Sequence, residues 1–359
     1  MDGIRIIDAD GHVEEPESMW AEYVEPKFLH LAPTRVIDNQ GRTRIMVGGQ
    51  MIPYKGPKAP NAEPPRPGGS YADARMPDME LEGLDAAVLY PSLGLPMAAV
   101  DRLDALVALD RAYNNWLFDY CKGREDKLIG IGLVPQIDVY EAMEETKRCV
   151  NKLGFRGIAL RPNVMGGRTI DHPAYDPLWS LLEELDVPLT IHEGTTQNIP
   201  LQAGTERYDN YLMVHAVSHP HEQQMALMSL ISGGVLERHP KLRVAFLESG
   251  AGWIGHWIDR LEHHMHHLGY LSFQLSMSPR EYFLRQCYIS ADPDESMIPG
   301  TISVLGDDNL LFATDYPHSD GFFPTAVSTL SAREDISPES KKKMMQDNPI
   351  KLYNLPPAT

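Results

Sequence analysis

Cysteine is scarce in this chain, with three residues among 359 that lie far apart, at Cys121, Cys149 and Cys287. No two of them form a CxxC pair, so the sequence predicts neither a disulfide framework nor a cysteine-based zinc site. The first residues, MDGIRIIDADGHVEEP, also lack a basic segment followed by an apolar stretch, and we expect no signal peptide. These features together predict a protein of a reducing compartment, the cytoplasm.

Positive charge and long apolar runs are in short supply as well. The chain has 32 Lys and Arg against 50 Asp and Glu, a net charge of −18, which disfavours binding to nucleic acids or anionic membranes. The longest apolar run, Ala86–Val100, is interrupted by Pro91 and Pro96 and is shorter than the roughly 20 residues of a membrane helix. We therefore expect a small molecule as the partner, rather than a nucleic acid or a membrane.

Short apolar segments are abundant by contrast, and hydrophobic residues make up 43% of the chain, enough for a sizeable core. Eight segments rich in Val, Ile, Leu and Ala do not alternate with polar residues, which is typical of strands buried on both faces of a parallel sheet. They are Ile4–Asp8, Ala86–Tyr90, Leu128–Val134, Gly157–Leu160, Pro188–Ile191, Leu242–Leu247, Cys287–Ser290 and Leu310–Ala313. Helix candidates between them are Asp101–Lys122, Tyr140–Lys152, Pro177–Leu185 and His221–Ser232.

This alternation predicts an α/β fold, with a closed (β/α)8 TIM barrel favoured and one domain over residues 1–359. A doubly wound open sheet would give the same alternation. Residues 31–70 depart from it, because a hairpin of Thr34–Ile37 and Arg44–Val47 precedes a proline-rich stretch. We interpret this segment as a lid inserted after the first strand. The second departure is Glu193–Pro220, a long loop after the fifth strand.

Polar residues follow several predicted strands, where a barrel places its catalytic groups. Asp10 and His12 follow the first strand, His192 the fifth and Asp315 the eighth. Asp10 and His12 are two residues apart, so in extended chain both side chains point the same way. Carboxylate oxygens and imidazole nitrogens are ligands of divalent cations such as Zn²⁺ or Mn²⁺. The sequence therefore predicts a metal site formed by these four residues.

Several segments in combination resemble the amidohydrolase superfamily, in particular the amidohydrolase-2 branch that includes aminocarboxymuconate-semialdehyde decarboxylase and resorcylate decarboxylase. The matching segments are IIDADGHVEEP, GLDAAVLYPS, GFRGIALRPN, VPLTIHEG, HPKLRVAFLESGAGW, LLFATDYPH and DNPIKLYNL, and they span almost the whole chain. The resemblance implies a distorted (β/α)8 barrel with one divalent metal ion. It places Asp10, His12, His192 and Asp315 at the positions of the family's ligands, and it implies a homo-oligomer, which we expect to be a dimer.

The chain departs from the family pattern at two strands. Many superfamily members have a carboxylated lysine on strand 4 that bridges two metals, but this chain has Arg161 at the end of that strand, which implies a mononuclear site. Decarboxylases of the branch usually have a histidine on strand 6, where this chain has Glu248. Glu248 is either a general base beside the metal or a carboxylate that binds the following turn. Asp315 is the other candidate base.

A histidine from the long loop is a further candidate to replace the missing strand-6 histidine. Among His215, His219 and His221 we favour His219, because Pro220 follows it at an expected helix start. The histidine-rich run from His263 to His267 is interpreted as a solvated helix face.

Candidate substrate contacts come from other strand ends. Arg161 is suited to bind an anionic substrate, because a guanidinium makes bidentate contacts with a carboxylate, although an ion pair with Glu193 is the alternative. Asn163 and His318 extend the set of polar residues at the mouth, and Tyr90 adds an apolar wall, with core packing equally expected.

The leading interpretation is a mononuclear metal-dependent hydrolase that acts on a small cyclic or aromatic compound through a metal-activated water. Zn²⁺ is the first choice of metal, followed by Mn²⁺ or Fe²⁺. The alternative is a non-oxidative decarboxylase of an aromatic or conjugated acid. A non-catalytic barrel that binds a ligand is less favoured, since it would not require four metal ligands.

Overall fold

The computed structural model describes residues 3–39, 41, 43–52, 66–194, 201–208 and 210–357. Its central strands run parallel and are fully buried, as the apolar segments predict. They are β1 (Ile7–His12), β5 (Ala86–Tyr90), β6 (Leu128–Gly130), β7 (Gly132–Leu133), β8 (Ile158–Leu160), β9 (Leu189–His192), β10 (Val244–Leu247), β11 (Cys287–Ala291) and β12 (Leu310–Phe312).

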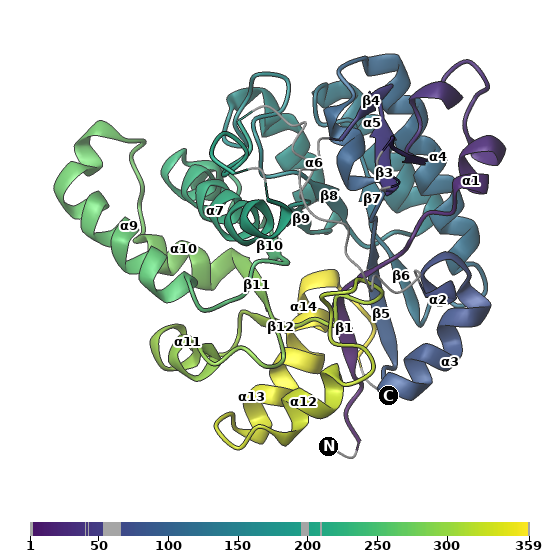
Figure 1. Cartoon of the computed structure of the whole chain (residues 1–359). Helices are drawn as coiled ribbons and strands as arrows, with labels where there is room; N and C mark the ends of the chain where they lie inside the picture. The colour runs from purple at the N-terminus through teal and green to yellow at the C-terminus, as the bar shows by residue number, and fades with distance from the viewer. Residues whose placement is uncertain are drawn as a thin grey trace.

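The strands form two sheets, in the orders β1-β5-β6 and β12-β11-β10-β9-β8-β7 (Figure 1). Only Ile131 separates β6 from β7, and its N–H donates to Leu89 O at 3.3 Å. At the other meeting point, Asp315 N–H donates to Asp10 O at 3.1 Å, which joins β1 to the segment after β12. Backbone hydrogen bonds therefore connect the sheets at both ends, and the predicted distorted barrel of the α/β class is confirmed.

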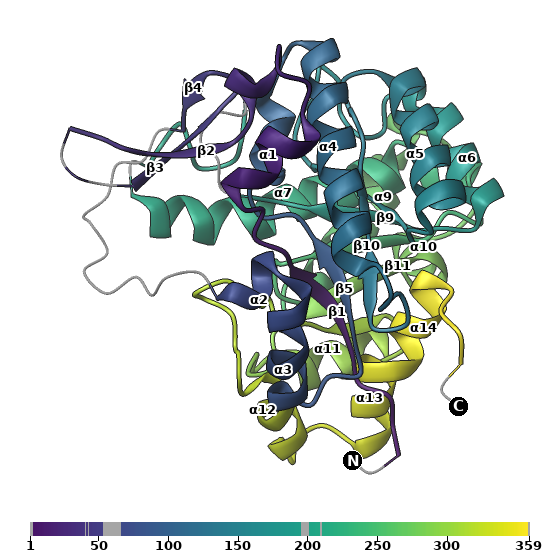
Figure 2. The ribbon, with the colours of Figure 1, turned by 90° about the vertical axis from the view of Figure 1, so that its right-hand side faces the viewer.

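Helices surround the strands in both views (Figures 1 and 2). They are α1 (Glu17–Tyr23), α2 (Pro67–Ser70), α3 (Ala72–Glu82), α4 (Leu103–Cys121), α5 (Val139–Leu153), α6 (Asp176–Leu185), α7 (Tyr211–Ser232), α8 (Val235–Arg238), α9 (Ile254–Leu268), α10 (Pro279–Gln286), α11 (Ile298–Leu305), α12 (Ala326–Ala332), α13 (Pro338–Lys342) and α14 (Asn348–Tyr353). Local signals set their limits; in α5, Asp138 caps the start and Gly154, with φ of 72°, ends the helix. No helix among the described residues is both long and apolar enough to span a bilayer.

Two predicted boundaries are wrong. The first strand was placed at Ile4–Asp8 but runs to His12, so Asp10 and His12 belong to the strand itself. The predicted loop Glu193–Pro220 is shorter, because α7 already starts at Tyr211, where the Asn210 side chain accepts a hydrogen bond from Met213 N–H. Pro220 lies inside this helix rather than at its start.

The predicted hairpin is present as an antiparallel sheet of β2 (Thr34–Ile37), β3 (Thr43–Val47) and β4 (Gln50–Met51). Figure 2 shows it at the end of the molecule where α1 lies, beyond the barrel strands. Residues 53–65, most of the proline-rich stretch, lie outside the described residues. The lid function of residues 31–70 and the single-domain organisation therefore stay predictions.

Candidate active site

Asp10 and His12 are buried in the last part of β1, and a bulge between Asp8 and Gly11 sets their direction. Asp8 accepts hydrogen bonds from Asp10 N–H at 3.2 Å and from the N–H and hydroxyl of Thr314 at 3.0 and 2.6 Å. Gly11 is required beside it, because a Cβ at this position would lie 2.5 Å from Asp8 Oδ2. Asp8 thereby ties β1 to the segment that leads from β12 to Asp315.

The rings of His12 and His192 meet edge-on at an interplanar angle of 81°, with their Nε2 atoms 3.2 Å apart. His12 Nδ1 lies 2.9 Å from Pro91 O, and His192 Nδ1 lies 2.6 Å from Glu193 O. Carbonyl oxygens only accept hydrogen bonds, so each Nδ1 must hold a hydrogen, which leaves the two Nε2 atoms to bind a metal. Burial, helped by His318 and His192, lowers the pKa of His12 well below its usual value, whereas the Asp10 and Glu248 carboxylates outweigh burial and raise the pKa of His192. Two Nε2 atoms at this distance fit a shared cation.

Carboxylate oxygens surround the two nitrogens. Asp10 Oδ1 lies 3.4 Å from His192 Nε2, Glu248 Oε2 lies 3.3 Å from the same atom, and Asp315 Oδ1 lies 3.4 Å from His12 Nε2. The other oxygen of Asp10 is held by Glu248 N–H and by the Ser290 hydroxyl. Asp10 Oδ1 and Glu248 Oε2 are buried without a hydrogen-bond partner within the described part of the chain. Such oxygens next to two imidazole nitrogens match the donor set of a divalent cation.

Backbone conformation aims two of these carboxylates. Glu248 has φ of 49° and Asp315 has φ of 54°, in the left-handed region that is costly for residues with a side chain. The sequence predicted Glu248 as a base or as a partner of the following turn. Glu295 takes the turn, because its carboxylate accepts hydrogen bonds from the N–H groups of Ala251 and Gly252. Glu248 is therefore available to the metal site.

His318 holds the Asp315 carboxyl group in place through a hydrogen bond. Its Nδ1 lies 2.7 Å from Asp315 Oδ1 and its Nε2 lies 2.8 Å from the Ser92 hydroxyl. Burial opposes its charge, but the Asp315 carboxylate outweighs burial and raises the pKa of His318 to about 10. Burial also raises the pKa of Asp315 to about 7. The pair therefore retains protons near neutral pH, and His318 is held by these two contacts rather than free at the mouth.

The histidines of the predicted loop lie on α7. His219 Nε2 is 3.4 Å from Glu248 Oε1, and His215 Nε2 is 3.9 Å from the same oxygen. His221 is exposed and its Nδ1 lies 2.9 Å from Val217 O, so it does not join them. His219 thus reaches the site as expected, although from inside a helix.

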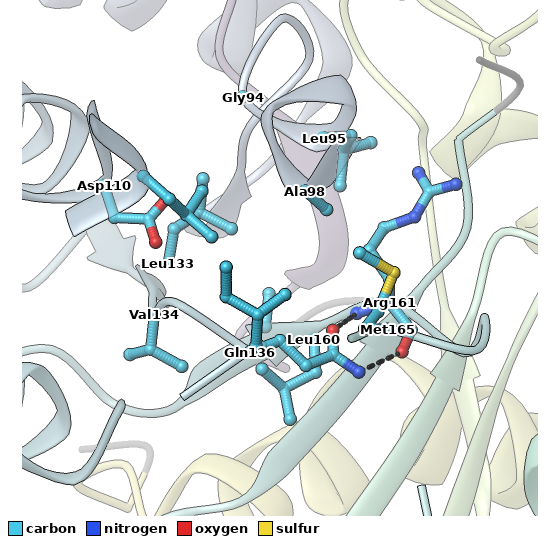
Figure 3. Close-up of a pocket in the computed structure, with 13 residues that line it drawn as sticks. Gly94, Leu95, Ala98, Asp110, Leu133, Val134, Gln136, Leu160, Arg161 and Met165 are labelled. Atoms are coloured by element: carbon cyan, nitrogen blue, oxygen red, sulfur yellow. Dashed lines mark hydrogen bonds between the residues drawn. The ribbon is translucent and has the colours of Figure 1, made fainter. Parts of the chain in front are cut away.

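Arg161 is buried and paired. Its Nη2 lies 3.0 Å from Glu193 Oε1 and donates to Gly194 O at 2.7 Å, and its Nε donates to Asn163 Oδ1 at 3.1 Å. The Gln136 side chain holds its backbone through two hydrogen bonds, the dashed lines in Figure 3. The ion pair that the sequence left as the alternative is therefore present, and it neutralises the predicted anion-binding residue. Asn163 is likewise engaged with Arg161.

Tyr90 does not form a wall for a substrate. Its side chain is fully buried, and its hydroxyl lies 2.7 Å from that of Tyr353. Its ring centroid is 5.5 Å from that of His192 and 6.1 Å from that of His12. The Tyr90 ring packs against the two histidine rings, as the core-packing alternative predicts.

Glu15 contributes to the site in a way that the sequence did not reveal. Its carboxylate accepts hydrogen bonds from Leu93 N–H at 2.8 Å and Gly94 N–H at 2.9 Å, just after Pro91, whose carbonyl faces His12. No motif marks this residue, since it is one of several acids in the segment VEEP. By contrast, the run from Glu262 to His267 belongs to α9, and the four histidines of this run are exposed, as expected for a solvated helix face.

Solved structures share the fold of this chain. An amidohydrolase from Mycobacterium avium subsp. paratuberculosis aligns with a TM-score of 0.81 at 22% identity, over 98% of this chain and 100% of the other. A 5-carboxyvanillate decarboxylase from Novosphingobium aromaticivorans, complexed with manganese and a nitrobenzoic acid, aligns with a TM-score of 0.73 at 22% identity, over 98% and 97% of the two chains.

Several of the sequence relatives are decarboxylases. A 2-amino-3-carboxymuconate-6-semialdehyde decarboxylase from Dictyostelium discoideum is 26% identical over 79% of this chain and 77% of its own. A gamma-resorcylate decarboxylase from Rhizobium sp. is 26% identical over 71% and 81%. These relatives overturn the prediction of a hydrolase and favour the decarboxylase alternative. The clusters of donors in this chain fit a divalent cation, and they do not single out zinc. The sequence profile of the family described as Amidohydrolase matches residues 7–355, and the chain belongs to this family of enzymes.

Proposed function

We propose that the protein is a metal-dependent, non-oxidative decarboxylase of a small aromatic or conjugated carboxylic acid, with Mn²⁺ as the metal. The observation that supports this most is the pair of opposed Nε2 atoms of His12 and His192, ringed by carboxylate oxygens at the carboxyl ends of the strands. Asp10, His12, His192 and Asp315 are the proposed ligands, with Glu248 as a fifth that the sequence assigned to other roles.

A divalent ion bound by these residues would supply positive charge for the oxygens of an anionic substrate and for negative charge that develops during the reaction. Arg161 is not free for this task, because its guanidinium is paired with Glu193. A substrate acid in a chain of net charge −18 needs such a counter-charge.

The hydrogen-bonded pair of Asp315 and His318 is the proposed proton donor. Non-oxidative decarboxylation adds one proton to the carbon that bears the carboxylate, the carbon–carbon bond then breaks, and CO₂ leaves; no external oxidant or reductant is needed. In the site without an ion, burial raises the pKa of Asp315 to about 7, and His318, 2.7 Å away, would keep the proton of the pair when the Asp315 carboxylate binds the metal. His219, through Glu248, is the second group able to supply a proton.

The test is to incubate the Mn²⁺-loaded protein with hydroxybenzoic acids and conjugated diacids and to measure CO₂ release. In D₂O we expect one deuterium at the carbon that lost the carboxylate. His12→Ala serves as the metal-free control and should release no CO₂ above background. A product of hydrolysis, or equal CO₂ release by His12→Ala, would contradict the proposal.

A further inference from the structure

Glu248 faces histidines on both sides. Its Oε2 lies 3.3 Å from His192 Nε2, and its Oε1 lies 3.4 Å from His219 Nε2 and 3.9 Å from His215 Nε2. His215 and His219 are four residues apart on α7, so both rings project from one face of the helix, and their centroids are 4.1 Å apart. Asp320 closes the set, with its Oδ2 3.5 Å from His215 Nε2.

We propose that His215, His219 and Glu248 Oε1, together with Asp320, form a second divalent-cation site, which the Glu248 carboxylate bridges to the first. This departs from the single ion that the resemblance implies. The absent strand-4 lysine is not needed here, because the second set of donors comes from α7 rather than from strand 4.

The hydrogen bonding of His219 supports a cation at this position. Its Nδ1 lies 3.2 Å from His215 O, which only accepts, so Nδ1 holds a hydrogen and Nε2 is the nitrogen that faces Glu248 Oε1. A proton or a metal ion between Nε2 and Oε1 makes this contact favourable, and the metal titration below distinguishes the two. The separations of 3.4–3.9 Å are those of neighbouring ligand atoms around an ion with bonds of about 2.0–2.2 Å.

The shared carboxylate of Glu248 gives a second argument. Its two oxygens face one set of donors each, Oε2 toward His192 and Oε1 toward His219 and His215. Two ions about 3.5–4 Å apart are a recurrent arrangement in two-metal enzymes.

The two histidines of the proposed second site differ in their exposure to solvent. The His219 side chain is 5% exposed, whereas that of His215 is 27% exposed. The second ion would therefore be anchored in the interior by His219 and Glu248 and open on the side of His215. An ion held in this manner has coordination positions left for oxygen atoms of a ligand.

The test is a Mn²⁺ titration of the full chain, followed by equilibrium dialysis and electron paramagnetic resonance. Exposed His263 and His267 are first replaced by alanine to remove adventitious binding on α9. In this background we expect two Mn²⁺ per chain and an exchange-coupled spectrum, because a shared carboxylate couples the two ions. His219→Ala should bind one Mn²⁺ with an uncoupled spectrum, and His219→Gln should do the same if the alanine variant is unstable.

His221→Ala is the matched control on the same helix and should keep both ions. His12→Ala should lose the coupling while retaining an ion at the second site, which separates this proposal from the assignment of the first site. One uncoupled Mn²⁺ at saturation in the starting protein would overturn the proposal and leave a His219–Glu248 ion pair in its place. Two ions in His215→Ala/His219→Ala would overturn it as well.

Discussion

His12 and His192 owe their metal-ready state to two backbone carbonyls, Pro91 O and Glu193 O, which fix the hydrogen of each ring on Nδ1. We expect His12→Ala and His192→Ala each to lower Mn²⁺ affinity more than about 100-fold, because loss of an outer-shell partner alone typically costs 10–100-fold. Metal content after gel filtration measures this. Exposed His264→Ala is the control, and equal metal content in all three variants would contradict the ligand assignment.

Asp315 combines a contact to the metal site with a proton. Asp315→Asn should lower kcat by about 10²- to 10⁴-fold, the usual contribution of a general acid or base, because an amide does not deliver the proton. The measurement is single-turnover decarboxylation at a Mn²⁺ concentration that saturates the variant. Ser92→Ala, which removes only the outer contact of His318, should cost far less. A rate close to that of the unmodified protein in Asp315→Asn would assign the proton to His219 and Glu248 instead.

At the residue scale, the sequence predicted that Asp10, His12, His192 and Asp315 meet, because strand ends of a parallel barrel converge. It could not place Glu248 beside them, since that depends on a backbone φ of 49° that turns the side chain inward. The ion pair of Arg161 with Glu193 was one of two alternatives, and only the distance between the two side chains in the folded protein decides between them.

Element boundaries depend on similar three-dimensional facts. The strands were predicted well, since burial on both faces produces continuous apolar runs. The start of α7 was missed because Pro220 normally marks a helix start, whereas here the Asn210 cap begins the helix ten residues before His221. For the proline-rich stretch, the sequence contains no comparable signal that predicts a helix or a strand.

The connection between β8 and β9 yields a prediction about stability. Arg161 and Glu193 are 4% and 0% exposed, so loss of one partner leaves a buried, uncompensated charge. Arg161→Met should lower the free energy of unfolding by about 3–5 kcal/mol. Arg161→Met/Glu193→Leu should recover much of that loss. Urea unfolding measures both variants, and an unchanged midpoint with an increased KM in Arg161→Met would instead indicate direct binding of substrate.

At the scale of the whole molecule, one buried carboxyl group lowers the free energy of unfolding as the pH rises from acidic values. Asp110 of α4 lies beside the small apolar pocket of Figure 3, with Oδ2 unpartnered among the described residues. Burial, reinforced by Glu145, raises its pKa well above the usual value. The folded state therefore binds a proton that the unfolded state releases above pH of about 3.9, and stability falls by about 1.4 kcal/mol per pH unit up to the folded-state pKa.

Asp110→Asn has no such proton, so it should be more stable than the unmodified protein at pH 8, with a difference that shrinks as the pH falls toward about 4. Urea unfolding at several pH values measures this. Asp104→Asn, at the exposed start of the same helix, is the control and should change little. A stability difference for Asp110→Asn that does not depend on pH would show that the Asp110 proton is not linked to folding.

The bond between β1 and the segment after β12 has a consequence for biosynthesis. Asp315 N–H donates to Asp10 O, and the Tyr353 hydroxyl donates to Ala9 O at 2.9 Å, so the first strand is completed by segments that are synthesised long after it. At about 5–20 residues per second, roughly 15–60 s separate the synthesis of these partners. During that time β1 can pair with β5, but its other edge and the Asp315 side of the candidate metal site are missing. We therefore expect metal loading at the first site to follow the synthesis of β12, and a nascent chain arrested before β12 to expose one open edge of β1.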